Sequence, residues 1–295
     1  MSATVTAPAG GPASGTTVGQ TPVQNVTFIR VLRSEWIKLW SLRSTWWTLG
    51  STVVVMVGFA LMMALIVQLV GNEMEGASPE DQAAAGGMLG GTMVVSAGFE
   101  MAALVVAVLG ALMITGEYST GMIRSTFAAV PGRLSAFFGK AVVLALVTAV
   151  LIAVSLALSW LVTYPILDAN NATVDFGDGA QVRSLFGTVL YVTLVALFAL
   201  GLGALLRHTA GAIFTVVAIF LVIPTIVQIA TFAAAQLEWV GTVNKLLPSV
   251  AGTQITPNAG AFADVLEPWV GISVLAGYTV LVLVGAATRL KTQDA

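Results

Sequence analysis

The feature that most restricts this chain is a set of six long apolar stretches with almost no charge inside them. A membrane-spanning helix needs about 20 apolar residues. Five stretches of that length contain no Asp, Glu, Lys or Arg: residues 44–72, 141–167, 184–206, 208–237 and 268–288. A sixth stretch, residues 82–116, is interrupted only by Glu100. Strands of membrane barrels are shorter, about 10 residues, and backbone groups in lipid must be hydrogen-bonded internally, so the pattern predicts six helices.

The overall composition excludes an ordinary soluble protein. Charged residues make up 9% of the chain and hydrophobic residues 57%, with a mean hydropathy of +0.94, whereas soluble domains carry about 25% charge. The net charge of −2 provides no basic field for phosphates, so we expect no nucleic-acid partner. The chain has no cysteine and a single histidine, His208. We therefore predict no metal site, no bound cofactor and no catalytic residues of its own.

The spacing of the charges predicts an all-α polytopic membrane protein with a single transmembrane domain, residues 26–291. We expect a disordered cytoplasmic tail before it, 1–25, and a short cytoplasmic tail after it, 292–295. The six spans are expected near 46–70, 92–115, 139–163, 185–206, 210–236 and 268–288. With an even number of spans both termini share a side, and that side holds ten of the 12 Lys and Arg residues. Because basic loops remain in the cytoplasm, both termini are predicted to be cytoplasmic.

Residues 27–44 predict an N-terminal amphipathic helix that lies in the membrane interface. At 100° per residue, one face carries the polar side chains, among them Arg30, Arg33 and Lys38. The apolar face carries Phe28, Ile29, Leu32, Trp36, Leu39 and Trp40. Basic residues opposite tryptophans are typical of a helix at the headgroup level. Glu35 falls at the edge of the apolar face and is expected to pair with Lys38. The plainer alternative is a juxtamembrane anchor that only satisfies the positive-inside rule.

The connection between the second and third spans, residues 115–140, is the longest cytoplasmic loop of this topology. Gly121 permits a tight backbone, and the loop has an apolar edge and several basic residues, so we predict a docking element for a partner protein. A plain basic loop is the alternative. Glu117 lies at the inner end of the second span, where we expect it to pair with Arg124 or Arg133 or to bond the backbone.

Glu100 is the acidic residue inside a predicted span. Ionisable groups at membrane depth are costly and are candidates for function. The 17 positions from Glu100 to Glu117 correspond to about 25 Å of helix, which puts Glu100 close to the outer edge of a core about 30 Å thick. Two interpretations therefore remain open. In the first, Glu100 lines a transport path or forms a bond between helices; in the second, it is a solvated or interfacial acid at a helix end.

The predicted outer segment, residues 237–267, is too long for a tight turn. It contains Pro248 and Pro257 with several small residues and the apolar run at 246–250. We expect it to form short helices or to re-enter the membrane in part.

Two short stretches resemble a known family. SEWIKL at 34–39, followed by RSTWW at 43–47, is similar to the start of ABC-2 type permeases from high-GC Gram-positive bacteria. These permeases are the transmembrane subunits of ATP-binding cassette transporters. GEYSTGMIR at 116–124 resembles the most recognisable stretch of that family, and it is the more specific of the two. Together with the six spans, the resemblance covers about residues 27–290.

The resemblance implies a coupling helix in the first cytoplasmic loop that docks on a separate ATPase subunit, which binds ATP and Mg. It also implies two permease halves around a central path in a bacterial plasma membrane. The direction of transport that it implies is export. Carried over to this sequence, the docking region holds Glu117, Tyr118, Gly121, Arg124 and Arg133. The interfacial helix holds Glu35, Trp36 and Lys38. The sequence fits such a division of labour, because it contains no G-x-x-x-x-G-K-[ST] motif for binding ATP.

The predicted function is thus a permease subunit, not an enzyme, that exports an amphipathic or hydrophobic compound. The main alternative is an ATP-independent carrier or channel, which needs an ion or proton relay at the membrane midplane, where no acidic or basic residue is predicted. An intramembrane hydrolase is disfavoured because His208 lies in a short predicted loop and not at membrane depth.

Overall fold

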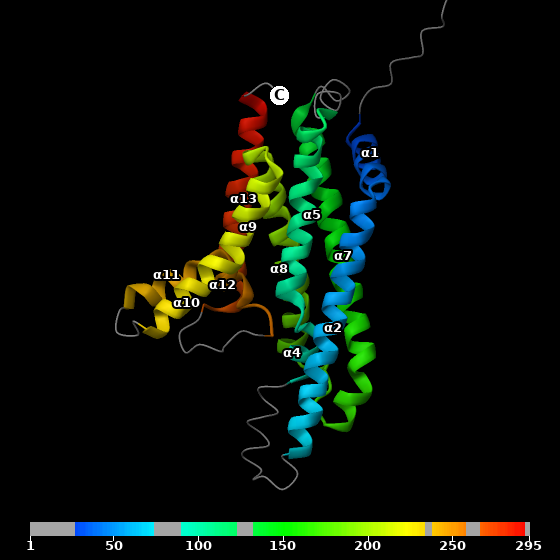
Figure 1. Cartoon of the computed structure of the whole chain (residues 1–295), viewed down its shortest axis with the longest axis vertical. Helices are drawn as coiled ribbons and strands as arrows, with labels where there is room; N and C mark the ends of the chain where they lie inside the picture. The colour runs from blue at the N-terminus through cyan, green and yellow to red at the C-terminus, as the bar shows by residue number, and fades with distance from the viewer. Residues whose placement is uncertain (1–26, 74–89, 123–131, 234–237, 258–265, 293–295) are drawn as a thin grey trace, which may run out of the picture.

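The computed structural model describes residues 27–73, 90–122, 132–233, 238–257 and 266–292. Within these ranges every regular element is a helix (Figure 1). The elements are α1 (Phe28–Ser41), α2 (Arg43–Glu73), α4 (Gly91–Ser96), α5 (Phe99–Ser119), α7 (Arg133–Ala169), α8 (Gly179–Leu206), α9 (Thr209–Val217), η1 (Ala218–Val222), α10 (Ile223–Ala233), α11 (Glu238–Leu246), α12 (Pro248–Thr253) and α13 (Pro268–Thr292). The chain is an all-α polytopic protein, as the apolar stretches predict.

Six helical stretches in the described residues are long and apolar enough to cross a membrane. They are Arg43–Asn72, Gly91–Ser119, Leu134–Ala169, Gly179–Leu206, Thr209–Thr231 and Pro268–Thr292. Several helices extend beyond the predicted spans, and α7 continues from Arg133 to Ala169 through Pro165. The physical reason is that charges limit how far a helix lies in hydrocarbon but do not end the helix itself. The predicted tail 1–25 lies outside the described residues, and Thr292 still belongs to α13.

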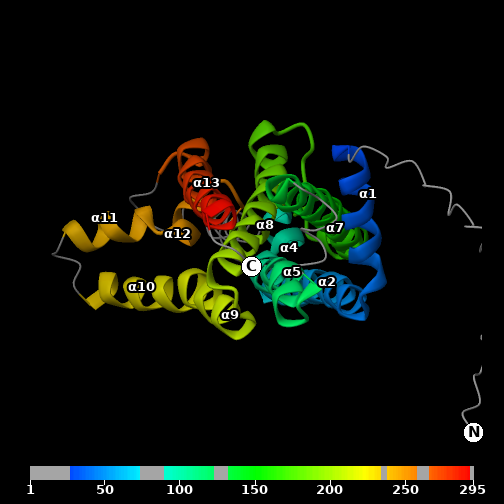
Figure 2. The same ribbon diagram turned by 90° about the horizontal axis from the view of Figure 1, so that it is seen from above.

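The start of α1 and the end of α13 lie at the same end of the bundle, called the terminal end below (Figure 1). The opposite end, where α2 and α7 finish, is called the far end. Helix α1 lies crosswise to α2. The view from above in Figure 2 shows α1 along its length, whereas the side view in Figure 1 shows α2 along its length. The chain changes direction at Leu42, whose extended backbone separates α1 from α2. This geometry suits a helix that lies along a membrane surface before the first span.

The centre of the bundle is the pair α5 and α8, and these two spans are the most buried of the six. Small residues let their backbones approach closely, as is common between membrane helices. A methyl group built on Gly110 of α5 would lie only 2.4 Å from the carbonyl oxygen of Ala196 on α8. Helix α13 packs on the other side of α8, and α2 packs on α7 and α5.

The fifth span is bent and leaves the bundle. Helix α9 runs along the bundle, passes into a π-helical segment, η1, and continues as α10, which points sideways (Figures 1 and 2). Pro224, at the start of α10, cannot donate a backbone hydrogen bond to the preceding turn, and π-helical segments also redirect helices. As a result this span is the least buried of the six.

The outer segment forms two short helices, α11 and α12, which confirms the expectation of short helices there. Helix α12 packs on α8 and α13, since a methyl group on Gly252 would lie 2.6 Å from Leu275 and 2.8 Å from Tyr191. Residues 258–265 of this segment lie outside the described ranges.

Candidate functional site: a buried charge cluster at the terminal end

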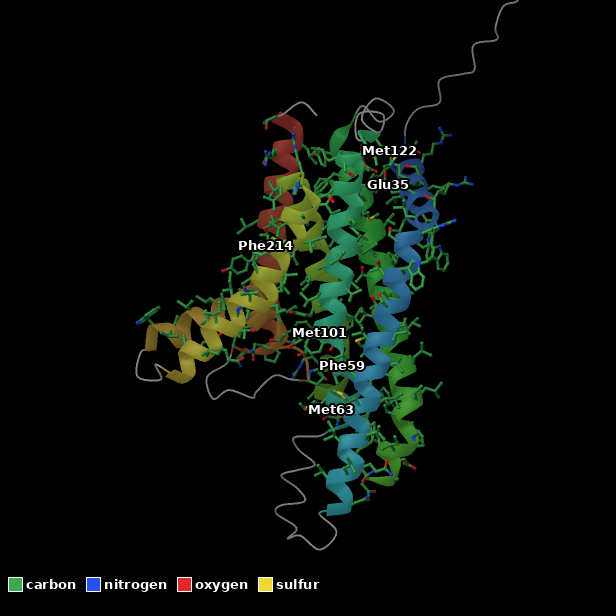
Figure 3. All side chains as sticks on the ribbon, viewed as in Figure 1. Glu35, Phe59, Met63, Met101, Met122 and Phe214 are labelled. Atoms are coloured by element: carbon green, nitrogen blue, oxygen red, sulfur yellow. The ribbon has the colours of Figure 1, made fainter. Side chains whose placement is uncertain are left out.

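Four charged side chains from three helices meet at the terminal end of the bundle. Lys140 of α7 donates hydrogen bonds from Nζ to Glu35 Oε2 of α1 at 2.6 Å and to Glu117 Oε1 of α5 at 2.9 Å. Lys38 of α1 donates to the same two carboxylates, at 2.9 Å to Glu35 Oε1 and 3.1 Å to Glu117 Oε1. These four residues are called the charge cluster below, and Figure 3 marks its position through the label on Glu35.

The charge cluster is buried and electrically balanced. The side chains of Glu35, Lys140 and Glu117 are only 1%, 4% and 6% exposed, whereas Lys38 is 32% exposed. Removing a charge from water costs several kcal/mol, which only close pairing and hydrogen bonding offset. Two carboxylates alternate with two ammonium groups, so each buried charge faces the opposite sign. Glu117 Oε2 is buried without a hydrogen bond in the described residues.

Lys38 remains charged at any physiological pH. Burial lowers the pKa of its ammonium, but the hydrogen bond to Glu35 and the negative charges of Glu117 and Glu35 outweigh this, so the pKa is raised above 10.5. A pKa that is raised in the folded state stabilises the fold below the unfolded pKa, and the contribution is lost as the pH rises through the folded value. The electrostatic contribution of Lys38 is therefore fully present at neutral pH.

Helix α1 carries the charge cluster because Glu35 lies in the centre of its buried stripe. Val31, Glu35 and Leu39 follow at four-residue spacing and are the buried residues of α1. A methyl group on Gly139 of α7 would lie 3.0 Å from Val31 Cγ1, so the glycine lets α1 approach α7. This buried stripe is the side of α1 that packs on the bundle, and the sequence pattern did not single it out.

The apolar side chains Phe28, Ile29 and Trp36 lie outside this buried stripe and are 45%, 77% and 40% exposed. That they contact the membrane interface stays a prediction. Glu35, predicted at the edge, is buried because Lys140 neutralises it from another helix. The predicted pair of Glu35 with Lys38 is confirmed.

Glu117 has two partners that were not predicted, while the predicted pairing with Arg124 or Arg133 is not tested. In the described residues Glu117 pairs with Lys38 and Lys140, neither of which the sequence argument proposed. Arg124 lies outside the described residues, as does the side chain of Arg133 at the start of α7. The predicted docking element between them lies outside the described residues as well. The connection between the two helices is shorter than the predicted loop, because α5 continues to Ser119 and α7 begins at Arg133.

Tyr118, next to Glu117, links α5 to the turn between α8 and α9. The guanidinium carbon of Arg207 lies 5.3 Å from the centre of the Tyr118 ring, a cation–π contact. Arg207 ends α8 in a left-handed conformation with φ 56°, and Arg289 of α13 donates a hydrogen bond to the carbonyl of Leu205. The last turn of α5 is therefore bonded on one side to α1 and α7 and on the other side to the α8–α9 turn.

Gly121 follows the end of α5 with φ +71°. This left-handed conformation strains side chains that have a Cβ, and glycine adopts it freely at helix ends. The N–H of Gly121 donates to the carbonyl of Tyr118, which turns the chain out of the helix. The expectation that Gly121 permits a tight backbone is confirmed.

The tryptophans at the junction of α1 and α2 form an aromatic group. Trp36 and Trp40 have ring centroids 5.6 Å apart, and Trp40 and Trp46 4.9 Å apart. Trp46 donates from its indole nitrogen to the carbonyl of Trp40 at 3.3 Å, and Trp47 is 82% exposed. Exposed indoles beside basic residues are typical of the membrane–water interface.

Glu100 lies in the first turn of α5, apart from the charge cluster. The candidate span begins at Gly91 of α4, and a turn at residues 97–98 separates α4 from α5. Both interpretations of Glu100, in a path or at a helix end, stay predictions. In the described residues no hydrogen bond or ion pair engages Glu100.

Sequence reasoning missed Lys140 as the central cation of the cluster. Lys140 follows Glu117 by 23 positions and Glu35 by 105, so no local spacing connects them. One signal was present: an uninterrupted apolar run begins directly after Lys140, and a lysine at the start of such a run needs either an interface or a buried partner.

In the described residues no group of three or more acidic or histidine side chains is placed to hold a metal ion.

The fold defines the chain as a multi-pass α-helical membrane protein. Comparison with known proteins adds no closer assignment, because no family model matches the chain and no curated protein matches its sequence.

Proposed function

We propose that the chain is the membrane-spanning permease subunit of an ATP-binding cassette transporter, and that a separate ATPase subunit docks on the residues between α5 and α7. The observation that carries this proposal is the position of the charge cluster. Glu117 and Lys140 flank that connection on its two sides, and both bond to α1. A force applied to the connection therefore reaches three helices through buried ion pairs.

The contacts of the last turn of α5 support this role. Glu117 bonds to α1 and α7, and Tyr118 contacts Arg207 between α8 and α9. Buried charged contacts have a preferred geometry and resist sliding more than apolar contacts do. Movement of the docking region displaces α5 together with its neighbours, and α5 is at the centre of the bundle. A transporter that is driven by a separate ATPase subunit requires such coupling.

The source of energy in this proposal is the partner. The sequence has no phosphate-binding loop with its lysine, so ATP and Mg belong to the ATPase subunit and the chain itself is a transport subunit and not an enzyme. The sequence resemblance described above supplies the direction, export, the second permease copy or homologue, and the bacterial plasma membrane. The distribution of Lys and Arg supports a cytoplasmic position for the terminal end in this proposal.

The first test is purification of the tagged chain from its native membrane in mild detergent. We expect an ATPase subunit with a phosphate-binding loop to co-purify in stoichiometric amount, and Glu117→Ala to abolish transport while the complex still assembles. Asp168→Asn, an exposed acid at the far end, is the matched control. A chain that purifies without any ATPase, or transport that is unchanged in Glu117→Ala, would contradict the proposal.

The predicted orientation can be tested by cysteine labelling, because the chain has no cysteine. Thr173→Cys lies in the exposed loop between α7 and α8, and Thr292→Cys at the exposed end of α13. A membrane-impermeant maleimide is expected to label Thr173→Cys on intact cells and to label Thr292→Cys only after the cells are opened. The reverse pattern would place the terminal end outside the cell.

A second candidate function is an ATP-independent carrier. The observation in its favour is Glu100, a carboxylate inside a candidate span, since carriers use ionisable groups at membrane depth. Transport by the purified chain in vesicles, without ATP or any ATPase, would support the carrier over the permease subunit.

A further inference from the structure

Helix α1 has an outer side that no described helix covers. Figure 2 shows α1 at the rim of the bundle, beside α7 and α2 and with no described helix beyond it. The buried stripe of α1, formed by Val31, Glu35 and Leu39, faces the bundle. Arg33 lies two positions from Val31 and two from Glu35, about 200° around the helix from each. The side chain of Arg33 is exposed and therefore points away from the bundle.

The outer side of α1 is basic. Arg33, together with Arg43 at the start of α2, is exposed, and so is Arg30. In the part of the chain that the structure describes, no acidic side chain pairs with Arg33 or Arg43. Glu35, the acidic residue of α1, is buried on the opposite side of the helix. The described protein therefore does not balance the charges of Arg33 and Arg43, and an anionic partner complements them.

These arginines lie at the level where the first span begins. Helix α1 runs crosswise to α2 (Figures 1 and 2), and the candidate span starts at Arg43. Directly after Arg43, Trp46 and Trp47 are 60% and 82% exposed. Exposed tryptophans at the end of an apolar span are typical of the headgroup level of a membrane. The anionic groups at that level are lipid phosphates, to which a guanidinium group donates two parallel hydrogen bonds.

The side chain next to Arg33 on this side of α1 is apolar. Ile37 follows Arg33 by one helical turn and is 59% exposed. An arginine beside an exposed isoleucine suits a lipid, which offers a phosphate and hydrocarbon together, better than it suits a purely polar acidic surface.

We propose that the outer side of α1, with Arg33 and Arg43, binds anionic phospholipids in preference to zwitterionic ones. Both lipids have a phosphate, but a zwitterionic headgroup carries its own cation, so the net charge of the lipid decides the preference. Basic residues directly beside a span are a common basis for such a preference. The predicted interfacial position of α1 leaves the lipid open, whereas this inference names its charge. Lipid binding is a property of this chain alone and goes beyond the proposed transport function.

The test measures the lipid preference of the full chain in detergent micelles by native mass spectrometry, without any ATPase. The probes are phosphatidylglycerol and phosphatidylcholine with the same acyl chains. We expect the wild type to bind phosphatidylglycerol more tightly, and Arg33→Gln to reduce this preference about fivefold, the contribution of one basic residue near a membrane surface. Arg33→Gln combined with Arg43→Gln is expected to reduce it further, and Arg33→Lys, which keeps the charge, to retain most of it.

Lys291→Gln is the matched control, because Lys291 is an exposed basic residue near the end of α13, at the same end of the bundle. It changes the net charge as Arg33→Gln does and is expected to keep the wild-type preference. Equal preference in the wild type and the double variant would overturn the proposal. An equal loss in Lys291→Gln would also overturn it, because overall charge would then determine binding. Arg43→Gln alone is measured under the same criteria, so the result does not depend on one variant.

The outcomes separate this inference from the proposed function. If an ATPase co-purifies but the double variant keeps the wild-type lipid preference, only the lipid site fails. If no ATPase co-purifies and Arg33→Gln still lowers the preference, the permease proposal fails and the lipid site stands. If Arg33→Gln keeps the lipid preference and loses a co-purifying ATPase, the outer side of α1 binds a protein, and the lipid proposal is wrong.

Discussion

Replacement of Lys140 with methionine is expected to destabilise the protein by about 3–5 kcal/mol, the usual cost of removing one partner from a buried ion pair. Lys140 is 4% exposed and bonds to both Glu35 and Glu117. Without it, two buried carboxylates share the single ammonium of Lys38, and one negative charge has no counter-charge. The thermal unfolding temperature and the yield of monodisperse protein in detergent measure the effect.

Two control variants make this prediction specific to charge. Lys38→Met is expected to cost less, because Lys38 is 32% exposed and water can replace part of its interaction. Lys140→Met combined with Glu117→Gln restores the charge balance and is expected to recover part of the lost stability. If Lys140→Met unfolds at the wild-type temperature, the cluster does not stabilise the fold. If the double variant is no better than the single one, the loss comes from packing and not from charge.

Gly110→Ala is the second substitution with a large expected effect, about 3 kcal/mol of destabilisation, at the upper end for overpacking. The added methyl group would lie 2.4 Å from the carbonyl oxygen of Ala196. Real methyl groups do not approach an oxygen so closely, and a backbone carbonyl cannot rotate away as a side chain can. Helices α5 and α8 must separate, and this loosens the most buried pair of spans. The measurement is again the unfolding temperature.

Gly58→Ala on α2 is the matched control, because a methyl group there meets nothing within 4 Å. Alanine favours a helix over glycine by about 0.5–1 kcal/mol, so this variant is expected to be as stable as the wild type or slightly more so. A Gly110→Ala variant that matches Gly58→Ala would show that α5 and α8 are farther apart than the structure places them.

The membrane-spanning helices were predictable because lipid offers the backbone no hydrogen-bond partners. A long uncharged stretch such as residues 141–167 can satisfy its backbone in lipid only as a helix, whatever the rest of the chain does. The pair Glu35–Lys38 and the turn at Gly121 were predictable for a similar reason, since each depends on residues close together in the chain. The bend of the fifth span at η1 and Pro224 was not predicted, although a proline inside an apolar run is a visible signal.

The all-α class, the six spans and the composition of the interfacial helix follow from the amino-acid sequence alone, because hydrophobic length and local periodicity set these. The packing of the helices was needed to show which face of α1 is buried, that Lys140 joins Glu35 and Glu117, and that Glu100 is exposed. These features depend on contacts between residues far apart in the chain. An apolar helix carries little information about its neighbours, because lipid and protein interior are both apolar, and packing alone selects the face that meets protein.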